Sequence, residues 1–327
     1  MTACRTTVSE PAPVPAAAAD VRARLDRFLN AYWLRPENAL WMTLRSLALS
    51  RCALRPPVLD VACGDGVFSF LHAGGSFALE FDVFSAVGHL DRVTRENADM
   101  FDAAPTDYRP SITCQPAWRI ALGTDLKPAL LQKAAALGFY DRLIRHDCNT
   151  PLPLADASFA TVYCNSAYWV RQVDQLLSEL RRVVRPDGKV VLHVKLAALR
   201  DYTLQRFRDQ LGPRFLNIID RGRLACWPAL ATRREWEARF ARAGLHVVEA
   251  RPFVTRTHAH LWDIGLRPIA PLLVRMANGL SPRTRAEIKR DWLALLQELL
   301  LPLCREDCDL FPGRSEPAEV QYVLSPQ

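Results

Sequence analysis

One stretch of the chain decides the fold class: Val58-Leu59-Asp60-Val61-Ala62-Cys63-Gly64-Asp65-Gly66. Its apolar start predicts a short buried strand, and the glycines predict a sharp turn into the apolar segment 67–71. In open α/β sheets such a turn lies at the carboxyl edge of the strands, where ligands bind. Gly64 and Gly66 leave backbone without side chains there, so a nucleotide-like ligand can approach the exposed amides of the next helix.

Strands and helices alternate after this turn. Short apolar runs that end in turn residues predict strands, and apolar residues at helical spacing predict the helices between them. The predicted strands are 119–124, 143–145, 159–164 and 190–194, and the predicted helices are 128–136 and 173–184. Pro186-Asp187-Gly188 predicts a turn into the last of these strands. The alternation predicts an α/β fold with a doubly wound, mainly parallel sheet.

The flanking segments have other patterns. Residues 1–19 are rich in Pro and Ala and predict a disordered leader, and residues 20–55 predict a helical cap whose second helix starts at Pro36. Beyond Leu196 the sequence predicts helices at 235–243 and 285–300 and strands at 247–254 and 319–324.

Composition narrows the range of partners. Half of the 327 residues are apolar, which suffices for a substantial core, and the formal net charge is +7. Basic residues, nearly all of them arginine, outnumber acidic ones between Arg200 and Arg290. This basic half could attract an anionic small molecule or RNA. Because no RNA-binding signature accompanies it, we do not expect nucleic acid as the partner.

Cysteine usage and hydropathy indicate a cytoplasmic protein. The nine cysteines have no metal-ligand spacing, and Cys304 and Cys308 have no second pair to complete a zinc site, so we expect reduced thiols and no metal. The start of the chain has no apolar signal segment. The most apolar late stretch, 261–280, contains Asp263 and Arg275, and we expect no transmembrane segment.

Polar residues also follow the later strands. Asp125 ends Gly123-Thr124-Asp125-Leu126, where a carboxylate can accept hydrogen bonds from both hydroxyls of a ribose. Asp147 follows Leu143-Ile144-Arg145-His146, and a later strand ends at Cys164-Asn165. The third glycine of a dinucleotide-binding G-x-G-x-x-G fingerprint would fall on Ser69, which disfavours a dehydrogenase.

This series of motifs resembles the class I S-adenosylmethionine (SAM)-dependent methyltransferases of the kind that modify small molecules. VLDVACGDG is similar to their first motif, and ALGTDLKPALLQKA to the ribose-binding strand and its helix. RHDCNTPLPLADASFATVYCNS is similar to the adenine-side loop and fourth strand, and LLSELRRVVRPDGKVVL to the fifth. The resemblance covers about residues 56–70 and 118–196.

The resemblance implies SAM as the cofactor and a seven-stranded sheet of methyltransferase type. The SAM-binding domain would span 56–327 with an insertion at 71–117 and mainly helical acceptor-side additions at 197–310. Asp60, Ala62, Cys63, Gly64 and Gly66 would then line the methionine side of the cofactor. Ribose and adenine would be held by Asp125 and Leu126, the adenine amino group by Asp147 with Cys148 beside it, and the pocket floor would be closed by Asn165.

The insertion is the main departure from the family. Asp125 follows Asp60 by 65 residues, whereas the family places the equivalent acid roughly twenty residues on. Since the extra residues leave from the cofactor edge, we expect a lid over the cofactor; the alternative is a surface excursion with a structural role.

The acceptor site is less defined by the sequence. Tyr168 and Trp169, after the fourth strand, could wall the pocket, and His193, near the end of the fifth, is the candidate general base, with a core histidine as the alternative. A helical flap over the acceptor could be formed by Tyr32, Trp33, Arg35, Glu37 and Trp41, although a core stripe is the default interpretation. An anionic acceptor group could be bound by Arg221 and Arg223, with solvated surface as the alternative. A metal could be suggested by the cluster of His258, His260, Trp262, Asp263 and Arg267, but no third metal ligand is evident there.

The function expected from all this is methyl transfer to a small-molecule acceptor, such as a specialised metabolite or a sugar- or lipid-linked intermediate. Two alternatives stay open: an RNA or protein methyltransferase, motivated by the basic second half, and a non-catalytic SAM-binding regulator. Asn165-Ser166-Ala167-Tyr168 lacks the Asn-Pro-Pro-aromatic signature of amino-group methylation on nucleobases and glutamine.

Overall fold

A seven-stranded sheet with the order β5-β4-β1-β6-β7-β9-β8 organises the chain. The computed structural model describes residues 18–85, 87, 100, 104–220, 227–266, 269–311 and 313–326. The strands are β1 (Val58–Val61), β4 (Ile120–Asp125), β5 (Tyr140–Arg145), β6 (Phe159–Cys164), β7 (Val184–Lys195), β8 (Leu245–Val254) and β9 (Glu319–Pro326). The predicted doubly wound, mainly parallel α/β sheet of seven strands is confirmed.

β1 lies between β4 and β6 and pairs in parallel with both, with Leu59 opposite Leu122 and Val61 opposite Cys164. All four residues of β1 are buried, as expected for a central strand covered on both faces. β9 runs antiparallel to both β7 and β8. The carboxyl ends of β1, β4, β6 and β7 therefore meet along one edge of the sheet.

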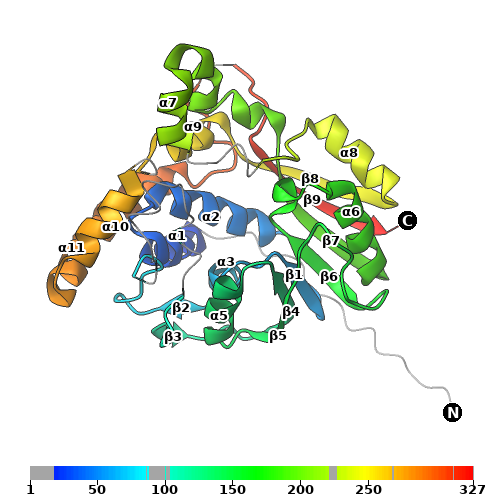
Figure 1. Ribbon diagram of the computed structural model, residues 1–327, viewed down its shortest axis with the longest axis horizontal. Helices are drawn as coiled ribbons and strands as arrows, with labels where there is room; N and C mark the ends of the chain where they lie inside the picture. The colour runs from blue at the N-terminus through cyan, green and yellow to red at the C-terminus, as the bar shows by residue number, and fades with distance from the viewer. Residues whose placement is uncertain are drawn as a thin grey trace.

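Helices cover both faces (Figure 1). α6 and α8 contact each other and pack on β6, β7 and β8, whereas α1, α2 and α3 contact one another, with α2 also against β8. The helices are α1 (Ala18–Tyr32), α2 (Pro36–Leu49), α3 (Val67–His72), α5 (Pro128–Ala136), α6 (Val173–Val183), α7 (Arg208–Asp220), α8 (Arg233–Arg242), α9 (Arg256–Ile264), α10 (Ala270–Asn278) and α11 (Pro282–Leu300).

The predicted elements are present, with shifts at their ends. The largest shift concerns β7, which starts at Val184, so the predicted turn at 186–188 lies within the strand. Its register explains the turn: Phe159 is opposite Val184, yet Thr161 is opposite Lys189, so extra residues bulge out of β7. Most of the predicted leader, 1–17, lies outside the described residues.

The described part of the 71–117 insertion is anchored in the core. It contains the short antiparallel pair β2 (Ser76–Phe77) and β3 (Ile112–Cys114), and the rings of Phe77 and Phe81 stack at 3.7 Å. The buried carboxylate of Asp82 accepts hydrogen bonds from Trp33, which directly follows α1, and from Arg285 of α11.

Lys289 of α11 adds to this anchor. Its Nζ donates to the carbonyl oxygens of Leu79 and Phe81 at 2.7 and 2.6 Å. The insertion and α11, some 200 residues apart in the sequence, therefore pack together beside α1. None of the helices that the structure describes is both long enough and apolar enough to cross a membrane.

Candidate cofactor and acceptor site

The turn after β1 contains three residues with left-handed backbone, namely Ala62 (φ 57°), Gly64 (φ 62°) and Gly66 (φ 74°). This conformation costs a residue with a Cβ atom roughly 1–2 kcal/mol, so the turn is strained at Ala62. Hydrogen bonds to β4 hold it: the Cys63 amide donates to the Thr124 carbonyl at 2.8 Å, and the Ala62 amide donates to the Thr124 hydroxyl at 3.3 Å.

Asp125 closes the turn from the end of β4. Its Oδ2 accepts a hydrogen bond from the Gly64 amide at 3.0 Å, and its Oδ1 accepts one from the Lys127 amide at 2.9 Å. Each carboxylate oxygen has a second lone pair left to accept from a ligand hydroxyl. The structure thus brings Asp125 and the glycine turn together, as the sequence predicted.

Gly64 and Gly66 are glycines for different reasons. A Cβ atom on Gly66 would lie 2.7 Å from the ring of Tyr140 and 3.1 Å from Leu137, so the absence of a side chain there lets the turn lie close against these two residues. A Cβ atom on Gly64 would have no atom within 4 Å. The space in front of Gly64 is therefore open, and the site fits a ligand that lies against this backbone beside Asp125.

The charge around the turn is negative. The charge of Asp125 contributes to a raised pKa at both Asp60 and Asp65. Burial raises the pKa of Asp60 to about 6 and also raises that of Asp65. The Asp60 carboxylate faces inward, where Oδ2 accepts hydrogen bonds from Ser69 at 2.6 Å and Tyr140 at 2.8 Å. Such a field favours a ligand that carries positive charge.

The predicted adenine-side residues line the same edge. Leu126, at the end of β4, is 49% exposed, which leaves an apolar surface that a flat ring could cover. The Asp147 Oδ1 accepts hydrogen bonds from the amide and side chain of Asn149, which lower its pKa. Burial raises the pKa of Cys148 to about 12, so this thiol stays protonated, and Asn165 is half-buried just after β6.

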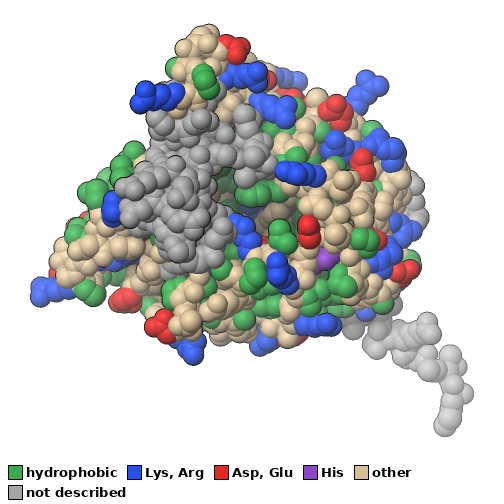
Figure 2. All heavy atoms as spheres, viewed as in Figure 1, with side chains coloured by type: hydrophobic (Ala, Val, Ile, Leu, Met, Phe, Trp, Pro, Cys, Tyr) green, Lys and Arg blue, Asp and Glu red, His purple; other side chains and the backbone are tan. Residues whose placement is uncertain are grey.

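The space-filling view is consistent with a recessed site. Figure 2 shows a hollow near the centre of the face drawn, with hydrophobic atoms on its floor. Tyr168 and Trp169 form the short helix η1 (Ala167–Trp169) after β6; Tyr168 is buried, whereas Trp169 is 51% exposed.

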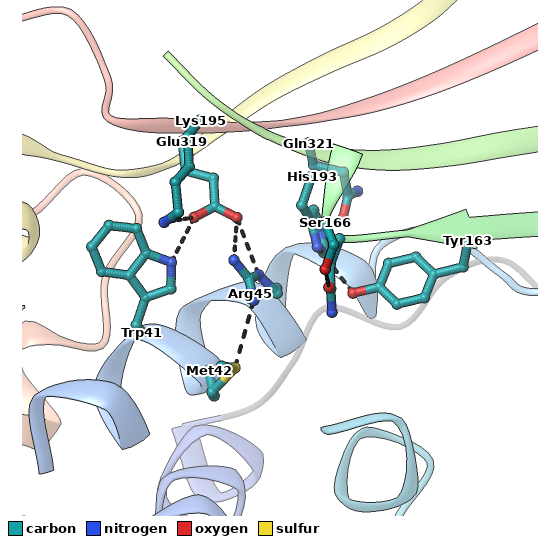
Figure 3. A network of polar contacts seen from close by, with 10 residues as sticks. Trp41, Met42, Arg45, Tyr163, Ser166, His193, Lys195, Glu319 and Gln321 are labelled. Carbon is teal, nitrogen blue, oxygen red and sulfur yellow. Dashed lines mark hydrogen bonds and ion pairs between the residues drawn. The ribbon is translucent and has the colours of Figure 1, made fainter. Parts of the chain in front are cut away.

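The geometry of His193 is that of a structural residue. Its side chain is fully buried, and both ring nitrogens are hydrogen-bonded, Nδ1 with the Tyr163 hydroxyl at 3.1 Å and Nε2 with the Gln321 amide oxygen at 2.8 Å (Figure 3). Burial, followed by the charge of Arg45, lowers its pKa to about 3. These features favour the core-histidine alternative for His193 over the general-base role.

A buried charge network lies beside His193 (Figure 3). Glu319 Oε1 accepts hydrogen bonds from Arg45 at 2.6 and 3.1 Å, and Oε2 accepts from Trp41 at 2.6 Å and Lys195 at 3.2 Å. Burial opposes ionisation of Glu319, but the charges of Arg45 and Lys195 outweigh it and lower its pKa to about 2. This network is not among the predicted site residues, and its one signal in the sequence is that Arg45 and Glu319 are charged residues inside apolar stretches.

The other clusters have structural roles or lie outside the described residues. His258 is hydrogen-bonded through Nδ1 to Thr255 and through Nε2 to the Leu303 carbonyl, so it has no nitrogen left for a metal. Among the residues that the structure describes, no group of three or more His, Cys, Asp or Glu side chains is placed to hold a metal ion. Arg221 and Arg223 lie in an undescribed segment.

A comparison with known protein families gives a match in the middle of the chain. Residues 110–192, 83 of the 327, match a family described as a methyltransferase domain. The matched segment covers β4 to β7, while the Val58–Gly66 turn lies before it, beyond the insertion. No curated protein matches the chain.

Several solved structures are similar in fold at low sequence identity. A SAM-dependent methyltransferase from Thermotoga maritima is 12% identical, with 94% of this chain and 100% of that chain covered and a TM-score of 0.44. One from Geobacter sulfurreducens, in complex with S-adenosyl-L-homocysteine, is 16% identical, with 88% and 90% covered and a TM-score of 0.41. A complex of the Haloferax volcanii Trm112 methyltransferase activator with a methyltransferase is 18% identical, with 72% and 78% covered and a TM-score of 0.42.

Residues 110–192 are similar to a methyltransferase domain, and the sheet is the seven-stranded, mainly parallel one expected for the class I SAM-dependent methyltransferases, whose cofactor is SAM. The acceptor does not follow from the fold or the match.

The two kinds of glycine lead to a testable difference. Gly64→Ala should cost about 1 kcal/mol of folding stability from its positive φ, and should weaken binding of S-adenosylhomocysteine at least about tenfold, because its Cβ atom enters the open space. Calorimetric titration and chemical denaturation measure the two effects.

Gly138 supplies the matched control for this substitution. It is exposed, has φ 61°, and its Cβ atom would meet only Gln115 at 3.9 Å. Gly138→Ala should lose similar stability and keep full affinity. Equal affinities of the two variants would show that the space before Gly64 is not the cofactor site.

The raised pKa of Asp60 predicts a pH dependence of stability. In the folded protein Asp60 keeps its proton up to about pH 6, whereas the ordinary pKa of an aspartate side chain is 3.8. Asp60 therefore destabilises the folded state increasingly as the pH rises from about 4 to about 6, and this loss of stability remains at higher pH. Asp60→Asn can keep the hydrogen bonds from Ser69 and Tyr140 without the buried charge. Its stability relative to the unaltered protein should therefore rise by about 3 kcal/mol between pH 4 and pH 8.

Urea denaturation at several pH values tests this expectation. The difference between the two proteins isolates Asp60 from groups such as Glu319, whose lowered pKa acts in the opposite direction. Asp187→Asn, at a side chain that is 75% exposed, is the control and should show almost no pH-dependent difference. A flat difference for Asp60→Asn would mean that Asp60 is not a buried carboxylate with a raised pKa.

Proposed function

We propose that the chain transfers the methyl group of SAM to a small-molecule acceptor bound at the carboxyl edge of β6 and β7. The observation that carries the proposal is the open space before Gly64, bounded by the Asp125 carboxylate and set in a negative field. SAM carries a sulfonium and an ammonium group, so the acidic residues complement its charge.

Different residues would bind different parts of the cofactor. The backbone of 62–66 holds the methionine side, and the two Asp125 oxygens accept from the ribose hydroxyls. Leu126 covers one face of adenine, and Asp147, with Cys148 and Asn165 beside it, completes that end of the pocket. Bound SAM supplies an electrophilic methyl group, and the chain's own part is to hold the acceptor in line with it at about 3 Å.

The burial of the acceptor side supports a small acceptor. Trp41, Tyr168 and Lys195, at the carboxyl end of β6 and β7, are at most 6% exposed. α2, η1 and α9 enclose this end, and a flat macromolecular surface would not reach it. The basic second half would favour an anionic acceptor over a cationic one.

The insertion is proposed as a cover for the cofactor. Its Tyr108 is half-buried and lies near enough to Asp65, in the glycine turn, for that charge to raise the tyrosine's pKa, although burial is the larger cause. We expect S-adenosylhomocysteine to slow proteolytic cleavage within 71–117 several-fold, while cleavage elsewhere keeps its rate. Limited proteolysis with mass spectrometry measures both, and unchanged cleavage in 71–117 would assign the insertion a structural role alone.

Asp125→Asn tests the cofactor site directly. The amide keeps one acceptor oxygen but loses the charge that strengthens bonds to the ribose hydroxyls, so SAM and S-adenosylhomocysteine should bind at least about tenfold more weakly. Asp141→Asn, an exposed substitution on the neighbouring strand β5, is the control and should bind normally. Calorimetry measures all three proteins.

Turnover decides between the remaining functions. Formation of S-adenosylhomocysteine with members of a small-molecule library is the expected result. Binding of SAM without turnover on any acceptor would favour a non-catalytic regulator. Turnover only on protein, or only on RNA together with strongly salt-dependent RNA binding, would replace the small-molecule proposal. Failure of the intact protein to bind SAM would refute the proposal altogether.

A further inference from the structure

Asn149 joins the loop after β5 to the start of α6. Its side-chain oxygen, Oδ1, accepts hydrogen bonds from the main-chain amides of Arg171 and Gln172, both at 3.0 Å. Gln172 directly precedes α6, so Asn149 satisfies amides at this helix start from a loop 23 residues earlier in the chain. Because main-chain amides can only donate, the oxygen of Asn149 has to face them, and its NH2 group has to face away.

That NH2 group is directed at the carboxylate of Asp147. Asn149 Nδ2 donates to Asp147 Oδ1 at 2.8 Å, and the main-chain amide of Asn149 donates to the same oxygen at 2.9 Å. The two hydrogen bonds, the main-chain one first, lower the pKa of Asp147, so the carboxylate is ionised at neutral pH. Asp147 Oδ2 accepts no hydrogen bond from the residues that the structure describes. Asp147 therefore presents one acceptor oxygen to a ligand, and Asn149 determines which one.

The position of Asp147 is fixed relative to Asp125. β4 and β5 are paired up to Asp125 opposite Arg145, and the next amide, that of His146, donates to the Asp125 carbonyl oxygen at 2.9 Å. Burial is the main cause of the raised pKa of Cys148, but the charges of Asp125 and Asp147 add to it, so this thiol lies near both carboxylates. Oδ2 of Asp147 thus belongs to the same edge of the sheet as Asp125.

These contacts give a role to a residue that acts through its neighbour. We propose that Asn149 is a positioning residue for the cofactor, which holds the Asp147 carboxylate so that Oδ2 accepts from the 6-amino group of adenine. The inference rests on the proposed function, in which Asp147 completes the adenine end of the pocket. Hypoxanthine has an oxygen at C6 and its proton on N1, so it sets an acceptor against Oδ2. A carboxylate that is held in place cannot follow the displaced proton, and the site selects adenine.

Two ligands that differ only in the base test this selection. S-inosylhomocysteine has the sugar and the amino acid of S-adenosylhomocysteine, with hypoxanthine in place of adenine. The unaltered protein should bind S-adenosylhomocysteine at least about tenfold more tightly, because Oδ2 meets an N–H group in one ligand and a carbonyl oxygen in the other. Calorimetric titration gives both affinities.

Asn149→Asp removes the donor and keeps the acceptor. The new carboxylate can still accept from the amides at the start of α6, but it repels Asp147, which can then turn toward the N1 proton of hypoxanthine. The preference for S-adenosylhomocysteine should fall at least about fivefold. Gln172→Glu is the matched control, since it makes the same amide-to-carboxylate exchange at an exposed side chain that does not cap α6. This control should keep the full preference.

Asp147→Asn should reverse the preference. With Asn149 in place, two N–H groups still point at the position of Oδ1, so the new amide places its oxygen there and its NH2 group toward the base. That group opposes the amino group of adenine and donates to the oxygen of hypoxanthine, so S-inosylhomocysteine should bind at least about threefold more tightly. A merely structural role of Asn149 would weaken both ligands alike and would leave their order unchanged.

The rest of the loop is held independently of Asn149, so we expect these variants to fold. Arg182 of α6 donates to the carbonyl oxygens of Leu152 and Leu154 at 2.9 and 2.7 Å. Glu179, also of α6, accepts from the Leu152 amide at 2.7 Å. Circular dichroism checks the fold of each variant before titration.

The outcomes separate this inference from the function on which it rests. Three results would each contradict the role of Asn149 while S-adenosylhomocysteine still binds: equal affinities of the unaltered protein for the two ligands, a full preference in Asn149→Asp, or an unreversed preference in Asp147→Asn. The first and third of these do not depend on whether Asn149→Asp folds. If the unaltered protein binds neither ligand, the proposed function itself is wrong.

Discussion

The hydrogen bond from the Gly64 amide to the Asp125 carboxylate joins the ends of β1 and β4, and the geometry of the cofactor edge depends on it. It forms because the two strands pair in parallel, with Val61 opposite Thr124. A shift of one residue in that register would turn the side chains of a strand to the opposite face of the sheet and remove Asp125 from the turn. The same pairing holds Ala62 in its left-handed conformation, since both amides after Val61 donate to Thr124.

This part of the structure could be predicted from the sequence because its determinants are local. Each strand is a short apolar run, and the acid or glycine that matters comes directly after it. Parallel strands bring such positions to one edge of the sheet, whatever the length of chain between them. The proximity of Gly64 and Asp125 could therefore be predicted despite the insertion at residues 71–117.

The acceptor side could not be predicted in the same way because its determinants are distant pairs. Arg45 and Glu319 are 274 residues apart, and only the folded sheet brings them into contact. His193 has the residue type of a general base and the right strand, but whether its nitrogens are available depends on Tyr163 and Gln321, which no local pattern connects to it. The anchor of the insertion through Asp82 and Arg285 is equally remote in sequence.

The position of β9 has a consequence for biosynthesis. β9 lies between β7 and β8 and pairs with both, yet it follows β7 by more than a hundred residues. On the ribosome, the edge of β7 therefore stays open while those residues emerge, and an open strand edge is a site of misassociation. Arg45 and Lys195 likewise meet the Glu319 carboxylate only when β9 arrives, so nascent chains that end before residue 319 contain the complete cofactor turn beside an unfinished sheet.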